Sequence, residues 1–307
     1  MRTIATGLQF PEGPIAMPDG SVLLVEIRRG SLTLVAPDGR PEVVAQLGGG
    51  PNGAAIGPDG ACYVCNNGGL HWRELGGLTI PGEGPHHYSG GRIERVDLKS
   101  GKVDVLYTHC DGQPLMGPND LVFDKQGGFW FTDFGRIEGR VRHRSGLYYA
   151  KADGSMIKEV VFPLQSANGV GLSPDERTVY IADTYSARLM AFDVSAPGEI
   201  IPSGSPVGAA RYVASAPGHC YFDSLAVDSL GHVSVATLIN GCITTFAPDG
   251  QLVRQIPLDD IAPTNLCFGG ADRKTAFITL SSTGRLVALD WPVSGLALNF
   301  EPRGLGH

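Results

Sequence analysis

The chain has 307 residues, 42% of them hydrophobic and 18% charged, which is enough to bury a sizeable core. The net charge of −7 and the lack of a continuous Lys/Arg run argue against a nucleic-acid partner. No stretch approaches the roughly 20 consecutive apolar residues of a membrane helix, and the first residues hold no apolar signal segment. We therefore expect a cytoplasmic protein with no membrane contact.

From the N-terminus onward, short β-rich runs alternate with Gly/Pro/Asp turns, and helical periodicity is nearly absent. Two sets of turns alternate along the chain. The first set is "MPDG" (17–20), "GPDG" (57–60), "DKQG" (124–127), "SPDE" (173–176), "DSLG" (228–231) and "GADR" (270–273). The second set is "APDG" (36–39), "VDLKSG" (96–101), "KADG" (151–154), "DVSAPG" (193–198), "APDG" (247–250) and "LDWP" (289–292).

This repeat predicts an all-β fold, a six-bladed β-propeller with four antiparallel strands per blade. A period of about 40–50 residues with two hairpin turns means four strands, A to D, in each unit, and six units are typical of a propeller. Strand A should be innermost, with the A–B and C–D turns on one face and the B–C loops on the other. We expect one domain over residues 1–307. The first run, "RTIATGL", has no turn of its own and should be the outer strand that closes the ring.

The six cysteines are spread along the chain, and without a secretory signal we expect reduced thiols. Cys62 and Cys65 have the spacing of half a zinc site or of a redox pair. Their context, "GACYVCNNG", is typical of a strand, in which residues three apart point to opposite faces. We interpret them as small core residues.

An oxygen-bearing side chain stands eight residues before the last position of each first-set turn. The six residues are Glu12, Asn52, Asn119, Asn168, Asp223 and Asn265. Any one alone would be an ordinary turn or cap residue. Their shared register predicts that all six lie at the entrance to an innermost strand, around the central axis on the B–C loop face.

Such a ring predicts a cation site. Glu12 and Asp223 would be costly to confine together without a cation, and asparagine oxygens add ligands without adding charge. An all-oxygen ligand set favours Ca²⁺, with Mn²⁺, Mg²⁺, Zn²⁺ or Fe²⁺ as alternatives. A second set of polar residues ends the B strands: Glu26, Asn66, Asp133, Asp183 and Asn240. These either orient the ring and line a pocket or simply cap the strand ends.

The B–C loops should shape the substrate pocket. The longest, from about Asn67 to Gly90, is rich in Gly and Pro, and we expect it to form a lid rather than a packed helix. An aromatic rim would suit a less polar substrate than a free sugar. The predicted substrate-binding residues are Asn52, Asn119 and Asn265 of the ring, and Trp72, His86, His87, Tyr185 and Tyr221 of the rim.

Four motifs in this order resemble the senescence-marker/gluconolactonase/luciferin-regenerating family over about Phe10 to Asp290. They are "PEGPIAMPDG", "PNDLVFDKQGGFWFTD", "ANGVGLSPDERTVYIADT" and "YFDSLAVDSLGHVSVAT". The resemblance implies a propeller with one catalytic divalent metal, usually Ca²⁺, at the channel mouth. It also implies lactone hydrolysis, or organophosphate hydrolysis as in related propellers. Ile15 and Ala16 follow the "EGP" motif where an aromatic is common, which points away from a sugar lactone.

The resemblance also implies roles for particular residues. The family's metal-binding residues fall on Glu12, Asn168 and Asp223, and Asn119 matches a position that binds metal or substrate. Asp120 stands beside it. We predict a hydrolase in which the metal polarises a lactone carbonyl and a carboxylate activates water, the base being either Asp223 or Asp120.

Three alternatives to a metal-dependent lactonase can be weighed from the sequence. A Ser/His/Asp esterase would need a G-x-S-x-G motif, which is absent from the sequence. A non-catalytic propeller that serves as an interaction scaffold would not need carboxylates and amides in one register. The same metal site on an organophosphate hydrolase remains an alternative to the lactonase.

Overall fold

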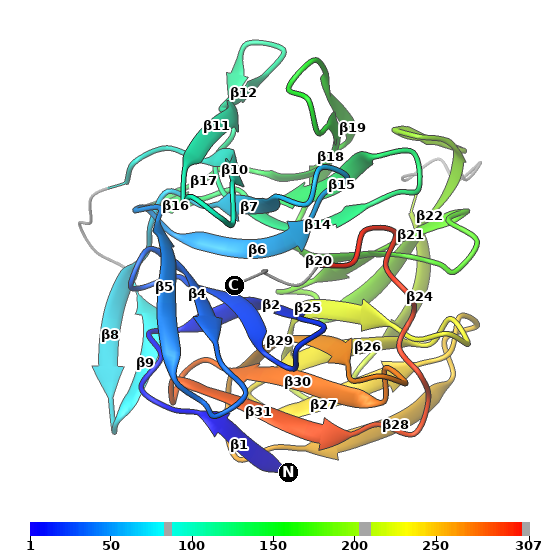
Figure 1. Ribbon diagram of the computed structural model, residues 1–307. Helices are drawn as coiled ribbons and strands as arrows, with labels where there is room; N and C mark the ends of the chain where they lie inside the picture. The colour runs from blue at the N-terminus through cyan, green and yellow to red at the C-terminus, as the bar shows by residue number, and fades with distance from the viewer. Residues whose placement is uncertain (83–87, 203–209, 303–307) are drawn as a thin grey trace.

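The computed structural model describes residues 1–82, 88–202 and 210–302 and shows six antiparallel sheets of four main strands each (Figure 1). The A strands are β2 (Pro11–Ala16), β6 (Pro51–Ile56), β14 (Pro118–Phe123), β20 (Ala167–Leu172), β25 (Tyr221–Val227) and β29 (Pro263–Gly269). The B strands are β3 (Val22–Glu26), β7 (Cys62–Asn66), β15 (Gly128–Asp133), β21 (Thr178–Asp183), β26 (Val233–Leu238) and β30 (Thr275–Leu280).

The outer half of each sheet follows the same pattern. The C strands are β4 (Ser31–Val35), β10 (Arg92–Val96), β18 (Ser145–Lys151), β22 (Arg188–Ala196), β27 (Cys242–Phe246) and β31 (Arg285–Asp290). The D strands are β5 (Pro41–Gln46), β11 (Val103–Tyr107), β19 (Ile157–Leu164), β24 (Arg211–Ser215), β28 (Leu252–Pro257) and β1 (Arg2–Ala5). A short extra strand, β23 (Glu199–Ile200), pairs with β22.

The A strands close the ring. Each packs against the A strand of the next blade in chain order, and β29 returns to pack against β2. The predicted six-bladed propeller is therefore confirmed. The N-terminal strand β1 pairs with β31 in the sixth sheet, which confirms that the first run of the chain closes the ring.

The first-set turns have the backbone conformation that their sequences predict. The last position of all six has a positive φ, and this includes the non-glycine residues Glu176 (φ 59°) and Arg273 (φ 53°). Glycine adopts this conformation without steric cost, which explains why four of the six turns end in it.

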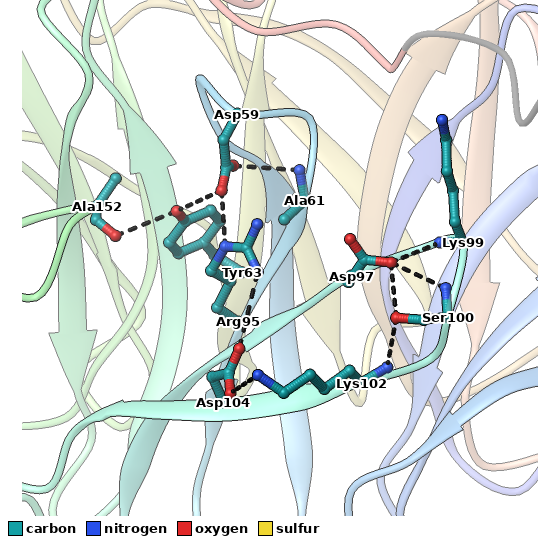
Figure 2. Close-up of polar contacts among 10 residues, drawn as sticks. All are labelled: Asp59, Ala61, Tyr63, Arg95, Asp97, Lys99, Ser100, Lys102, Asp104 and Ala152. Atoms are coloured by element: carbon teal, nitrogen blue, oxygen red, sulfur yellow. Dashed lines mark hydrogen bonds and ion pairs between the residues drawn. The ribbon is translucent and has the colours of Figure 1, made fainter.

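Figure 2 shows how aspartates stabilise two neighbouring turns of the second blade. Asp59 accepts a hydrogen bond from the backbone N–H of Ala61 (3.2 Å) and forms an ion pair with Arg95 (2.6 Å). In the adjacent C–D turn, Asp97 accepts hydrogen bonds from the backbone N–H and the hydroxyl of Ser100, both at 2.8 Å. An aspartate that accepts hydrogen bonds from the backbone of its own turn fixes the hairpin locally, so the repeat of the turns can be recognised in the sequence.

The last second-set turn, "LDWP", does not join a C strand to a D strand. The D strand of the sixth sheet is β1, so after "LDWP" the chain continues as a C-terminal segment outside the sheet. This segment (292–302) crosses the A–B turn face, which we term the lower face. Gly295 N donates to Arg273 O (2.8 Å), Leu296 N to Val227 O (3.1 Å) and Asn299 Nδ2 to Phe123 O (3.0 Å).

The core consists of apolar clusters between neighbouring blades. Cys62 contributes to one cluster, with Leu23 and Val25 of the first blade, while Cys65 contributes to the next, with Phe129 and Phe131 of the third. All six cysteines are free thiols, and five of them are buried. The interpretation of Cys62 and Cys65 as core residues is therefore confirmed.

Three hairpins extend from the core sheets. They are β8 (His71–Leu75) with β9 (Leu78–Gly82), β12 (His109–Cys110) with β13 (Gln113–Pro114), and β16 (Ile137–Glu138) with β17 (Val141–Arg142). The first and third are the B–C loops of blades two and three, on the face that we term the upper face. Across the described ranges, no helix is long and apolar enough to span a membrane.

Candidate active site

The six oxygen-bearing side chains occupy equivalent places in the six A strands. Each is the second or third residue of its strand, as the register predicted. Five of the six are buried, and Asp223 is half-buried. They form a ring where the chain enters the innermost strands, and we term this set the oxygen ring.

A β-bulge lies at the oxygen ring in every blade. The pairing of strands A and B shifts register at or directly beside the ring residue in all six sheets. In β14, for example, Asn119 and Asp120 together face the single residue Thr132 of β15. Bulges bend a strand and re-aim its side chains, and they recur next to active sites.

Glycines next to the ring residues allow the A strands to approach closely. A Cβ at Gly53 would lie 2.5 Å from Asn119 O, and one at Gly169 would lie 2.7 Å from Leu225 N. A Cβ at Gly13 would lie 2.8 Å from Ala54 N. The "EG" and "NG" pairs of the sequence therefore hold neighbouring blades together at the level of the ring.

Asp120 crosses the channel beneath the ring. Its Oδ2 accepts a hydrogen bond from Ser224 Oγ, which lies in the fifth blade, and its Oδ1 accepts one from Leu121 N (2.9 Å). A cavity of about 740 Å³ extends from Asp120 and Asn265 down to the lower face. Asp120 thus lies at the upper end of this cavity, with both oxygens occupied.

The three carboxylates at the channel mouth repel one another. Burial raises the pKa of Glu12 from 4.5 to about 8, although Asn265 Nδ2 (2.8 Å) and Gly13 N (2.7 Å) donate to it. Burial and the charge of Glu12 raise the pKa of Asp223 well above 3.8, and burial raises that of Asp120 to about 6. No Lys, Arg or His in the described ranges forms an ion pair with them.

The donor set of the ring fits a hard divalent cation. Asn168 Nδ2 donates to Thr184 Oγ1 (3.2 Å), but its Oδ1 is buried with no hydrogen-bond partner among the described residues. A buried oxygen left unpaired beside two unneutralised carboxylates is costly unless a cation binds there. Among the described residues, no three His, Cys, Asp or Glu side chains are placed to hold a metal ion by themselves, so asparagine oxygens would have to complete the ligand set.

The polar residues that end the B strands anchor loops. Glu26, for example, accepts a hydrogen bond from Gln9 N (2.6 Å), and Asp133 accepts from Met116 N (2.7 Å) and Gly117 N (2.8 Å). Asn66 and Asp183 bind the backbone of their own entering loops in the same way. These contacts favour the interpretation that the four side chains cap strand ends by accepting hydrogen bonds from loop N–H groups.

Asn240 differs from the other four. It lies beyond the end of β26, is exposed, and its side chain donates to Pro217 O at 3.4 Å.

Aromatic side chains gather on the upper face beside the oxygen ring. Tyr185 packs edge-on against Tyr221, with ring centroids 5.6 Å apart, and Phe134 lies 5.8 Å from Tyr185. His219 also packs edge-on against Tyr221, with ring centroids 5.4 Å apart. Tyr221 precedes Asp223 by two residues in β25, so the rim is continuous with the ring.

The long B–C segment of blade two is a hairpin that reaches over the first and sixth blades. Trp72 of β8 packs on Phe10, with ring centroids 4.8 Å apart, just before Glu12 in the chain. Thr79 N donates to Ser282 O (2.9 Å) of the sixth blade. The predicted residues His86 and His87 lie outside the described residues.

Sequence reasoning missed three contacts in and around the ring. Thr184 bonds Asn168 of the ring, Ser224 bonds Asp120 beneath it, and Phe10 packs against Trp72 of the β8–β9 hairpin, which we term the lid hairpin after the predicted lid. Ser224 directly follows a ring residue, and extending the eight-residue register by one position would have drawn attention to it and to Asp120 together. Thr184 and Phe10 lie in loops, where the repeat carries no register.

A family model described as the SMP-30/gluconolactonase/LRE-like region matches residues 10–282. The chain belongs to this family. The matched range contains all six A strands and the whole oxygen ring. The predicted resemblance to the senescence-marker/gluconolactonase/luciferin-regenerating family is thus confirmed.

Named members of the SMP-30/gluconolactonase/LRE-like family are similar along most of the chain. Lactonase drp35 of Staphylococcus saprophyticus is 31% identical over 253 residues, which are 81% of this chain and 70% of the relative. The gluconolactonase of Zymomonas mobilis is 24% identical over 310 residues, covering 92% of this chain and 79% of the relative.

Solved structures share the fold. An Agrobacterium tumefaciens structure described as a calcium-binding protein, regucalcin, has a TM-score of 0.75 at 20% identity and covers 98% of this chain and 96% of its own. A Xanthomonas campestris gluconolactonase has a TM-score of 0.74 at 23% identity and covers 94% of this chain and 89% of its own. At these identities the similarity shows a common propeller architecture.

Proposed function

We propose that the protein is a divalent-metal-dependent lactonase whose reaction centre is the oxygen ring. The observation that carries the proposal is the unpartnered Oδ1 of Asn168 next to Glu12 and Asp223, which have no cationic neighbour in the described ranges. The names of the relatives, lactonase and gluconolactonase, support the reaction class. The calcium-binding description of the regucalcin structure supports Ca²⁺ as the ion.

Glu12, Asn168 and Asp223 would hold the cation, with Asn119 beside them. A cation bound there would supply positive charge to polarise the lactone carbonyl and to stabilise negative charge on its oxygen. The Glu12 carboxylate is held in place for this purpose, because Asn265 and the backbone N–H of Gly13 donate hydrogen bonds to it.

We assign the role of general base to Asp223 rather than Asp120. Asp223 is half-buried and reachable from the upper face, whereas both oxygens of Asp120 accept hydrogen bonds beneath the ring. Water would add to the carbonyl carbon while Asp223 takes its proton. The ester C–O bond then breaks, and the proton passes to the departing ring oxygen, which gives an open-chain hydroxy acid. Asp120 would position the ring from below.

The neutral asparagines and the rim would hold the substrate. Asn52 and Asn119 make no side-chain hydrogen bond to any described residue, so their amides are available to a ligand. Tyr185 and Tyr221 add an aromatic wall, which suits a lactone with an apolar ring face.

The test is hydrolysis of γ-butyrolactone, D-glucono-1,4-lactone and a phosphotriester before and after dialysis against a chelator. We expect lactone turnover to fall at least about 100-fold on chelation and to return with Ca²⁺, and metal analysis to give one cation per chain. Asp223→Asn should lose turnover to a similar extent.

Three results would contradict the proposal. Full lactone turnover in the chelated protein would exclude the metal mechanism. Normal turnover in Asp223→Asn would remove that residue as the base. Turnover of the phosphotriester alone would replace the lactonase with an organophosphate hydrolase.

A further inference from the structure

A concentrated positive charge lies in the B–C loop of the third blade. Residues 136–144, "RIEGRVRHR", hold four arginines and a single acid, Glu138, in a chain with a net charge of −7. They form the β16–β17 hairpin, with His143 N bonded to Arg136 O (2.8 Å). Within the described ranges Glu138 pairs with Arg136 (3.0 Å) and approaches His143 (3.7 Å). We term this segment the arginine hairpin.

Three of these arginines have no acidic partner among the described residues. Arg140, Arg142 and Arg144 are exposed, and none forms an ion pair with any residue that the structure describes. Arg142 NH2 donates to Gln165 O (2.6 Å), and Arg144 Nε donates to Leu164 O (3.3 Å). These bonds to backbone oxygens fix the two side chains without neutralising their charge.

The arginine hairpin is connected to the oxygen ring through Tyr185 and its neighbours. The guanidinium of Arg142 lies 4.5 Å from the centre of the Tyr185 ring. The residue before Tyr185 is Thr184, whose hydroxyl accepts the hydrogen bond from Asn168. Tyr185 also packs against Tyr221, which precedes Asp223. Arg142 therefore lies at the edge of the candidate active site.

This charge does not serve the ring itself, because neither Glu12, Asp120 nor Asp223 forms an ion pair with an arginine among the described residues. Arg140, Arg142 and Arg144 of the arginine hairpin are exposed. A guanidinium has five N–H donors in a fork that matches the two oxygens of a carboxylate. Arg142 donates one of its N–H groups to the backbone oxygen of Gln165.

We propose that the substrate lactone carries a carboxylate, which the arginine hairpin binds through Arg142 while the lactone carbonyl lies over the oxygen ring. This inference rests on the proposed lactonase function and specifies its substrate class. The aromatic ring of Tyr185 would contact the lactone between the two charged ends. Arg140 and Arg144 raise the local positive potential, which attracts an anionic substrate to the upper face.

The experiment compares two lactones that differ in one substituent. They are γ-carboxy-γ-butyrolactone and γ-hydroxymethyl-γ-butyrolactone, and each enzymatic rate is divided by the hydroxide-catalysed rate to remove intrinsic reactivity. We expect the carboxylated lactone to have a kcat/KM roughly tenfold higher at low salt, the scale of one charge-assisted contact. The preference should shrink in 0.5 M NaCl, because salt screens exposed charges.

The variants are Arg142→Gln, Arg142→Lys and, as a matched control, Arg177→Gln. Arg177 is exposed next to an A–B turn on the lower face, so its substitution changes the net charge equally. Arg142→Gln should remove most of the preference, Arg142→Lys should restore part of it, and Arg177→Gln should leave it unchanged. Equal kcat/KM for the two lactones, or a preference that survives Arg142→Gln, would overturn the proposal.

Binding of lactams separates this proposal from the lactonase function. Pyroglutamate and pyroglutaminol are the lactam counterparts of the two lactones and resist hydrolysis, so calorimetry can measure both with the Ca²⁺-loaded protein. We expect pyroglutamate to bind roughly tenfold more tightly and to lose this advantage in Arg142→Gln, even in a preparation that hydrolyses neither lactone. Equal affinities, or no binding of either lactam, would refute carboxylate recognition without bearing on hydrolysis of neutral lactones.

Discussion

The burial of Glu12 predicts that the protein without its cation becomes less stable as pH rises. Its pKa is raised from 4.5 to about 8, so between these values the folded chain holds a proton that the unfolded chain has released. The free energy of unfolding therefore falls with increasing pH across this window. Each pH unit changes it by about 1.4 kcal/mol, which gives a fall of about 4 kcal/mol from pH 5 to pH 8.

This fall should be visible as a shift in Tm. At roughly 2.1 cal/mol/K per residue, 307 residues give an unfolding entropy of about 0.6 kcal/mol/K, so Tm should fall by about 6 °C. Asp120 and Asp223 act in the same direction, because burial raises their pKa values too. The assay is differential scanning calorimetry of chelated protein at several pH values, with and without Ca²⁺. At 100 times its Kd, Ca²⁺ should restore about 2.7 kcal/mol at pH 8.

Glu12→Gln provides the decisive comparison. The amide can still accept the hydrogen bonds from Asn265 and Gly13 but cannot ionise, so the chelated variant should exceed the wild type in Tm at pH 8. It should also lose most of its stabilisation by Ca²⁺. Glu42→Gln, at an exposed position of β5, is the control with the same change in charge. A Tm that rises or stays level from pH 5 to pH 8, or an equal fall in Glu12→Gln, would refute the reasoning.

Three further substitutions test the geometry of the site. Asn168→Ala removes the unpartnered buried oxygen and should weaken Ca²⁺ binding at least tenfold in a calorimetric titration, while unchanged affinity would show that Oδ1 is not a ligand. Gly53→Ala places a Cβ 2.5 Å from Asn119 O and should lower the free energy of unfolding, measured by urea denaturation, by about 1–3 kcal/mol. Wild-type stability of this variant would mean that the blades can separate freely. Trp72→Ala removes the packing of the lid hairpin on Phe10 and should raise KM for lactones several-fold with Tm within about 2 °C of the wild type, whereas an unchanged KM would exclude the hairpin from substrate binding.

The blade register was readable from the sequence because each turn is fixed by its own residues. Asp59 bonds the backbone two residues ahead, and the positive φ at Gly60 ends the same turn. A count of eight residues back along an extended strand then reaches the oxygen ring, since a strand has a regular rise. Glu176 and Arg273 replace glycine at the last turn position but keep its positive φ, so the count of eight residues still reaches Asn168 and Asn265 of the oxygen ring.

Contacts between distant blades could not be predicted in this way. Asp120 and Ser224 are 104 residues apart, and they meet only because bulges turn both side chains towards the axis. The path of the C-terminal segment across the lower face depends equally on blade geometry. The local sequence of "LDWP" predicts a hairpin turn, which the structure does not have because β1 is the D strand of that sheet. The Gly/Pro-rich composition of residues 67–90 predicts a lid rather than a helix, but it does not predict the pairing of β8 with β9.

The distribution of charge around the channel connects the ring with the arginine hairpin. Glu12 and Asp223 lie on the first and fifth blades, on either side of Asn265 in the sixth, and Asn168 is next in the fourth. A cation held by Glu12, Asp223 and Asn168 would therefore lie on that side of the axis, and Asn119 of the third blade is the next ring residue after Asn168. The third blade also carries the arginine hairpin. Arg142 of this hairpin lies beside Tyr185, which follows the B strand of the fourth blade, so a lactone with its carbonyl over the cation would extend its far end outward along the fourth blade to Arg142. Positive charge at both ends of this path matches a molecule with an ester at one end and a carboxylate at the other.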